Sequence, residues 1–327
     1  MNRNLSDLLI RRLAALASPG GARGRLSILI YHRVLEPSEP FNLGHPTAPQ
    51  FEAQMRAIAS QFTPLALDDA IARLRSASLP PRAIAVTFDD GYADNATVAL
   101  PILARFGIPA TFFVATAFIG GGRMWNDAVI EALRALPSGA HDLRAWGCED
   151  GDLSSDAKRV QAIRSVIDSL KYVAPEEREA RVRDLAQFAD LPRTSKLMMS
   201  EDQIRELRAA GMAIGAHTET HPILARCDAL VARREIAESG RRLAEIIHEP
   251  VRLFAYPNGK PGADYTPAHA AMVRDAGYAG AVSTVPGAAD RCSDVYQLPR
   301  FTPWDRDLTR FSLRLVTNLR RPVAAAA

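Results

Sequence analysis

Short apolar runs rich in β-branched and aromatic residues alternate with helical patterns along most of this chain. The runs are almost continuously apolar, which is typical of parallel strands buried on both faces. This alternation predicts an α/β fold with a parallel sheet, either open or closed into a barrel. The predicted strands are 28–31, 84–88, 111–114, 213–216, 253–256 and 281–283, and the predicted helices are 51–62, 68–76, 93–106, 201–210, 231–247 and 268–276.

The segment 125–196 breaks this alternation, because it is charged, mostly helical in pattern and interrupted by glycine and proline. We predict that it is a helical insertion between two strands of a single domain spanning residues 1–327, with its core at about 26–303. A C-terminal helix is expected at 307–320.

Leucines near the N-terminus predict an amphipathic helix over 4–17. Arg11 and Arg12 interrupt what would be a signal-peptide core, and no small-residue cleavage site follows. The pattern favours a helix packed on the domain, with peripheral membrane contact through this helix as the alternative. No apolar run approaches the ~18 to 20 residues that span a bilayer, so the expected location is cytoplasmic. The leucines are Leu5, Leu8, Leu9, Leu13 and Leu16.

The composition excludes some classes of function. Three cysteines, Cys148, Cys227 and Cys292, lie far apart and form neither a C-x-x-C pair nor a disulfide framework, which indicates a reducing compartment. The net charge is only +3, and no dense basic run with interleaved aromatics argues for nucleic-acid binding. No feature of the sequence indicates an oligomeric state.

Two adjacent carboxylates, Asp89 and Asp90, stand at the carboxyl end of the second predicted strand, and Gly91 follows them. Burying two unpaired carboxylates is costly. A divalent cation would offset that cost by binding one carboxylate and stabilising the ionised form of the other. The alternative is a turn in which an aspartate caps the next helix, and Asp-Asp-Gly by itself favours that turn.

Two histidines four residues apart, His217 and His221, follow the predicted strand 213–216. If the segment coils as a helical turn, both imidazoles can point at one centre, and neutral imidazole suits divalent transition metals. Together with Asp90 they give three protein ligands, the arrangement of a catalytic zinc site that leaves one position to water. The expected cofactor is therefore a divalent metal, Zn²⁺ first, with Co²⁺, Ni²⁺ and Mn²⁺ as alternatives.

The order and spacing of these motifs resemble the polysaccharide deacetylase (NodB-homology) family, carbohydrate esterase family four. The likeness covers roughly 26–300 and includes the segments 109–114 and 254–259. It implies a distorted (β/α) barrel and a metal-dependent reaction on an N-acetylated glycan. That reaction removes the N-acetyl group of an N-acetylhexosamine in a polysaccharide, oligosaccharide or glycan precursor and releases acetate and a free amine.

By position, the resemblance implies that Asp89 is the general base and that Asp90, His217 and His221 bind the metal. The segment 256–258 matches the loop that lends a backbone N–H to the oxyanion.

That match makes Tyr256 and Asn258 candidates for contact with the substrate. Among the aromatic residues, Tyr92 follows the Asp-Asp-Gly turn and could stack on a sugar ring, as could Trp125 and Trp304, with core packing as the alternative reading.

Two departures from the family pattern add further candidates. Ala255 replaces the arginine that usually orients the catalytic aspartate, and Arg300 could supply that charge to Asp89; an ordinary surface arginine is the alternative. The late Leu-x-His motif that supplies the general acid is missing. His32, at the end of the first predicted strand, resembles the matching histidine of poly-N-acetylglucosamine-type deacetylases, the proposed general acid there; a core or capping histidine is the alternative.

Two other functions remain open for this sequence. A similar barrel could hydrolyse a small amide, imide or ureide such as allantoin, although relatives of that kind often lose metal ligands that are present here. A non-catalytic carbohydrate-binding barrel would be expected to lose Asp89 or a ligand, and none is lost.

Overall fold

The computed structural model describes residues 3–36, 44–192, 195–303 and 305–321. Within these ranges seven parallel strands form one sheet in the order β1-β3-β4-β5-β6-β7, and β2 pairs with β3. The strands are β1 (Ser27–Tyr31), β2 (Thr63–Pro64), β3 (Ala83–Phe88), β4 (Ala110–Val114), β5 (Ala213–Ala216), β6 (Leu253–Ala255) and β7 (Gly280–Val282).

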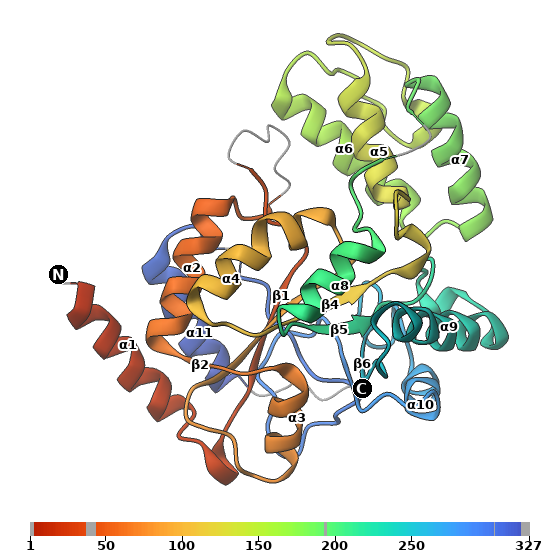
Figure 1. Ribbon diagram of the computed structural model, residues 1–327. Coiled ribbons are helices and arrows are strands. Elements are labelled where there is room, and N and C mark those ends of the chain that lie inside the picture. The colour runs from red at the N-terminus through yellow and green to blue at the C-terminus, as the bar shows by residue number, and fades with distance from the viewer. Residues whose placement is uncertain (1–2, 37–43, 193–194, 304, 322–327) are drawn as a thin grey trace. The chain divides into compact units, whose positions relative to one another are not determined.

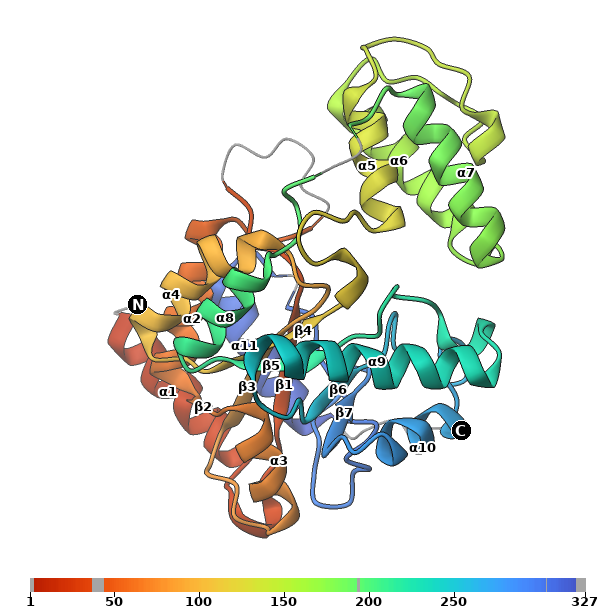
Figure 2. The ribbon, with the colours of Figure 1, turned by 45° about the vertical axis from the view of Figure 1, so that its right-hand side comes forward.

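Most of the helices cover the outside of this sheet (Figure 1). At the N- and C-terminal ends of the described chain, α1 and α11 lie side by side with α2, as both views show (Figures 1 and 2). The α-helices are α1 (Arg3–Ala17), α2 (Ala48–Gln61), α3 (Leu67–Arg75), α4 (Leu100–Phe106), α5 (Trp125–Ala135), α6 (Asp156–Leu170), α7 (Pro175–Phe188), α8 (Glu201–Ala209), α9 (Ala229–Ile247), α10 (Pro267–Asp275) and α11 (Leu308–Arg320).

An extended segment, 298–301, joins the two edges of the sheet. Leu298 forms a parallel bridge with Val282 of β7, and Phe301 forms one with Leu29 of β1. The segment therefore occupies the place of a further strand between β7 and β1. The fold is the distorted (β/α) barrel that the family resemblance implied.

Alternate residues of β3 belong to two different apolar clusters. Ala83 and Ala85 pack in the barrel interior, whereas Val86 and Phe88 pack between the sheet and the outer helices. Because successive side chains of a strand point to opposite faces, the inward row continues to Asp89. The strand thus delivers this carboxylate to the interior at its carboxyl end.

The predicted strands match the observed ones to within one residue at each end. The predicted helix 93–106 is instead a π-helical turn, Asn95–Ala99, followed by α4. Pro101 has no N–H for an α-helical bond to residue 97, and the Leu100 N–H donates to the Asn95 carbonyl five residues back. Strand β2, only two residues long, was too short to leave a pattern in the sequence.

Residues 121–198 form a compact unit of their own, inserted in the sequence between β4 and α8. Its helices α5, α6 and α7 lie within the predicted range and pack around a separate apolar cluster that includes Leu133, Ile163 and Leu185. All the residues of the candidate site lie in the other unit, the barrel.

Candidate active site

The Asp-Asp-Gly turn begins where β3 ends. The Asp89 N–H donates to the Tyr31 carbonyl at 2.9 Å, which extends the pairing with β1 by one residue. Asp90 then has a φ of 77° and Gly91 a φ of 93°. A Cβ on Gly91 would lie 2.8 Å from Cγ1 of Val114, so only glycine fits this turn.

Arg300 pairs with Asp89 in the barrel interior. Its Nη1 and Nη2 donate to Oδ1 and Oδ2 of Asp89 at 2.6 and 2.7 Å, and its Nε donates to the Ser283 carbonyl at 2.9 Å. Both side chains are buried, and two parallel bonds fix the carboxylate in one orientation. The arginine suggested from the sequence as a substitute for the charge missing at Ala255 therefore does contact Asp89.

This pair keeps Asp89 ionised. Burial raises the pKa of its carboxyl group, but the Arg300 guanidinium, together with His217, lowers the pKa further, so that it lies below the ordinary value. A carboxylate held in this way is ready to accept a proton at neutral pH.

The imidazoles of His217 and His221 converge on Asp90. Nε2 of His217 and Nε2 of His221 each lie 3.5 Å from Oδ1 of Asp90, and one ligand atom from each residue falls within 4.8 Å of the others. The segment between the histidines is not the helical turn considered from the sequence. Thr218 and His221 instead adopt left-handed backbone conformations, with φ of 63° and 55°.

The free atoms of this cluster suit a cation. Nδ1 of His217 lies 2.7 Å from the Ala255 carbonyl, which can only accept, so Nδ1 carries the proton and Nε2 is left as a lone-pair donor. Oδ1 of Asp90 is buried without a hydrogen-bond partner among the described residues. Burial, together with neighbouring His217, lowers the pKa of His221 to about 4, so this imidazole is neutral at pH 7. The three side chains therefore fit a divalent metal.

Glu235 of α9 holds the loop that carries the two histidines. Its buried carboxylate accepts hydrogen bonds from the N–H groups of Glu219 and Thr220 at 2.8 and 2.9 Å, and from Oγ1 of Thr220 at 2.8 Å. These bonds satisfy backbone donors of a loop that is neither helix nor strand. The sequence analysis did not identify Glu235, since it lies 14 residues beyond His221 within a helical pattern.

His32 follows β1 and is half-buried. Its carbonyl accepts from Nδ2 of Asn95 at 2.9 Å, and Asp94 accepts from Nε of Arg33 at 2.7 Å and from the Val34 N–H at 3.2 Å. The π-helical turn after the Asp-Asp-Gly motif thus anchors the His32 loop. Burial raises the pKa values of Asp89 and Asp90, and the neighbouring charged groups, which include His217 and His32, lower them.

A further histidine, His45, faces this site and was missed from the sequence. Its ring centroid lies 6.2 Å from that of His32. Burial, with His32 and Arg33 nearby, lowers the pKa of His45 to about 3, so its imidazole is neutral. A parallel bridge between Leu35 and Thr47 ties its loop to the residues after β1, a contact with no sequence signature.

In the loop after β6, the Tyr256 side chain lies in the core, whereas Asn258 is half-buried. The Tyr256 side chain is fully buried, stacks on Tyr265 with ring centroids 3.8 Å apart, and donates to the Tyr296 carbonyl. The Tyr256 N–H donates to the Val282 carbonyl, so neither group is available to a substrate. Asn258, with a φ of 59°, is half-buried, and its N–H has no hydrogen-bond partner within the described ranges.

The remaining aromatic candidates were Tyr92, Trp125 and Trp304. Tyr92 is buried, with the Arg33 guanidinium 4.9 Å from its ring centroid. Trp125 belongs to the inserted unit, and Trp304 lies outside the described residues.

Curated proteins and solved structures both include relatives of this chain. Among curated proteins, a candidate polysaccharide deacetylase of Bacillus subtilis (strain 168), YxkH, is 23% identical over 278 residues, which cover 84% of this chain and 70% of the relative. The deacetylase PplD of Streptococcus pyogenes, solved in complex with acetate, has a TM-score of 0.59 at 18% identity and covers 91% of this chain and 99% of its own. IcaB from Ammonifex degensii has a TM-score of 0.56 at 20% identity, with 90% and 97% covered.

The two solved structures share the barrel fold with this protein. A sequence profile of the family described as polysaccharide deacetylase matches residues 76–281, a range that includes the Asp-Asp-Gly turn and both histidines. The chain therefore belongs to the polysaccharide deacetylase family, whose members are hydrolases acting on carbon–nitrogen bonds.

Proposed function

We propose that the protein hydrolyses the N-acetyl group of an N-acetylhexosamine unit in a polysaccharide, oligosaccharide or glycan precursor, releasing acetate and a free amine. The convergence of Asp90, His217 and His221 beside an ionised, arginine-bound Asp89 carries this proposal. An amide is a poor electrophile, and a buried carboxylate next to three metal-ligand side chains is suited to its hydrolysis.

We infer that Asp90, His217 and His221 would hold one divalent ion, most simply Zn²⁺. Such an ion, when bound, polarises the amide carbonyl and lowers the pKa of water. Asp89 then accepts the proton of the attacking water, while Arg300 keeps its carboxylate ionised and aligned. The free N–H of Asn258 donates to the developing oxyanion.

The leaving amine needs a proton, and His32 is the residue we assign to donate it. His32 directly follows β1, which pairs with the strand that leads to Asp89, and the hydrogen bonds with Asn95 and Asp94 fix its loop. The neutral ring of His45 beside it can hydrogen-bond to the sugar.

Metal binding tests the ligand set directly. We expect the metal-free wild-type protein to bind one Zn²⁺ in a calorimetric titration, and His221→Ala to weaken binding by at least about 100-fold, more than is typical for loss of an outer partner. His248→Ala, an exposed histidine at the end of α9, is the matched control and should bind like the wild type. Equal binding by all three proteins would remove the assignment.

Glu235→Gln should loosen the histidine loop without removing a ligand. Glutamine keeps one acceptor oxygen but loses the second acceptor and the negative charge, so the three hydrogen bonds to the loop weaken, and we expect zinc affinity to fall about 10- to 100-fold. Glu238→Gln, one turn along α9, changes a half-buried side chain that forms an ion pair only with Arg241 among the described residues, and it should leave the affinity unchanged. The role of Glu235 would be contradicted if its variant matched Glu238→Gln.

The reaction and its substrate are tested by acetate release from chitin oligomers and poly-N-acetylglucosamine, with allantoin as a separate assay. We expect hydrolysis of the sugars, and a loss of about 10²- to 10⁴-fold in kcat in both Asp89→Asn and His32→Ala with zinc content retained. Hydrolysis of allantoin alone would replace the proposal with the ureide function, and binding of the sugars without any turnover would indicate a carbohydrate-binding barrel.

The pH dependence tests the pairing of Arg300 with Asp89. Because the pKa of Asp89 is held below its ordinary value, the base stays ionised to low pH, and kcat/KM should fall only as the pH drops through that pKa. Arg300→Gln removes the positive charge, so the acid limb should move to higher pH by about one to three pH units. Arg300→Lys keeps the positive charge and should move the acid limb much less. Identical acid limbs in both variants and the wild type would refute this coupling.

A further inference from the structure

Helix α1 packs on the barrel through one face only. Ile10 and Ala14 are buried against α2 and α11. Four leucines on the opposite face are exposed, with exposed fractions of 60% for Leu5, 45% for Leu8, 52% for Leu9 and 75% for Leu16. Their spacing places them on one side of the helix together with Arg12. We call this set the leucine face.

The leucine face continues onto α11. Leu9 and Leu313 line the same groove of about 650 Å³ between α1, α2 and α11, and Leu313 is also exposed. Single exposed leucines are ordinary, but a contiguous apolar patch on a folded protein is typical of a surface that meets a partner.

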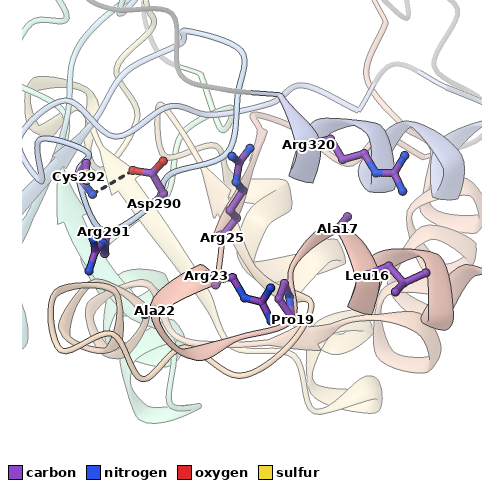
Figure 3. A pocket seen from close by; sticks show the side chains of 11 residues that line it. Leu16, Ala17, Pro19, Ala22, Arg23, Arg25, Asp290, Arg291, Cys292 and Arg320 are labelled. Atoms are coloured by element: carbon purple, nitrogen blue, oxygen red, sulfur yellow. Dashed lines mark hydrogen bonds between the residues drawn. The ribbon is translucent and has the colours of Figure 1, made fainter.

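An arginine-lined hollow borders this face. It has a volume of about 470 Å³ and is lined by Arg23, Arg25, Arg291 and Arg320, with Leu16 of the leucine face among its other lining residues. Figure 3 shows Leu16 and Arg320 on one side, Arg23 below, and Arg291 on the other side. The apolar surface and the basic surface are therefore continuous.

These arginines are not neutralised within the protein. None of the four forms an ion pair in the part of the chain that the structure describes, and the side chain of Arg25 donates there only to the Leu319 carbonyl, at 3.4 Å. The acid that lines the hollow, Asp290, accepts from the Cys292 N–H and from Oγ of Ser293.

Some other surface arginines are paired with acidic side chains. Arg56 pairs with Glu52, and Arg73 with Asp69. The lining of the hollow therefore holds four guanidinium groups and one carboxylate, that of Asp290, which leaves a net excess of positive charge.

We infer that the leucine face and the arginine hollow together bind the surface of an anionic lipid bilayer. Leucine side chains would enter the boundary of the acyl chains while guanidinium groups meet lipid phosphates, the combination by which amphipathic helices bind such surfaces. None of the helices in the described ranges combines the length and apolar character needed to cross a bilayer, so this contact is peripheral.

Charge favours the bilayer over a second copy of the chain. A two-fold dimer through this face would bring two copies of the same positively charged surface into one interface, and like charges would repel. An acidic soluble partner would match the arginines but leave the leucines without a role.

The surface lies away from the candidate active site. Arg25 precedes β1 and His32 follows it, so about 20 Å of extended chain separates them. Binding at the amino end of β1 leaves the carboxyl ends of the strands accessible. The inference is thus independent of the proposed reaction and would stand or fall separately from it.

Vesicle sedimentation tests the inference. We expect the wild-type protein to sediment with vesicles that contain one third phosphatidylglycerol but not with phosphatidylcholine alone, and added salt to weaken the binding. Leu5→Asp/Leu9→Asp/Leu16→Asp and Arg23→Gln/Arg291→Gln/Arg320→Gln should each lower the partition coefficient by at least about tenfold.

Matched controls distinguish an effect of this surface on vesicle binding from a general effect of surface hydrophobicity or net charge. Leu230→Asp changes an exposed leucine of α9, and Arg164→Gln/Arg183→Gln/Arg233→Gln removes the same net charge from exposed positions elsewhere. Both should bind like the wild type. All variants should keep the wild-type circular dichroism spectrum and acetate release from soluble oligomers, because the changed side chains are exposed and none of them belongs to the candidate site.

Three results would overturn the inference. The wild-type protein could fail to bind anionic vesicles at low salt, or the charge-matched control could lose as much binding as the arginine variant. The third is that the leucine variant converts a dimer to a monomer in light scattering while still binding vesicles, which would assign the face to self-association.

Discussion

Two adjacent carboxylates, Asp89 and Asp90, lie buried at the end of β3, and each requires compensating positive charge to remain ionised there. Arg300 meets this need for Asp89 through two parallel hydrogen bonds. Asp90 has only imidazoles within reach, and Oδ1 of its carboxylate has no hydrogen-bond partner in the described chain. The two environments agree with the roles that we propose: a fixed guanidinium binds the carboxylate proposed as the base, whereas the carboxylate proposed as a metal ligand keeps an oxygen available to an exchangeable cation.

The barrel could be predicted well from the sequence because its strands are buried on both faces and therefore continuously apolar. The same pattern located the chemistry, since Asp89, Asp90 and His217 follow directly after such strands. Arg300 was identified as a partner of Asp89 from a gap in a familiar motif, and the structure confirms that contact. These features depend on residues that are close to strand ends, where sequence position fixes spatial position.

Features that depend on loops could not be predicted in this way. The left-handed conformation of Thr218, and the reach of Glu235 across to the histidine loop, are set by tertiary contacts between α9 and the end of β5. Tyr256 was taken as a substrate residue because of its motif, but its ring packs against Tyr265 in the core. His45 was overlooked because nothing near it in the sequence distinguishes its loop from any other, and only the bridge from Leu35 to Thr47 brings it to the site.

The segment 298–301 supplies both the last strand-like connection of the barrel and the guanidinium that holds Asp89. A nascent chain can form β1, β3 and β4 long before this segment leaves the ribosome, but until then the sheet keeps an open edge and Asp89 lacks its counter-ion. The segment therefore closes the barrel and pairs Arg300 with Asp89 in the same step. A chain that ends before residue 298 would lack both the strand-like connection and the counter-ion of Asp89.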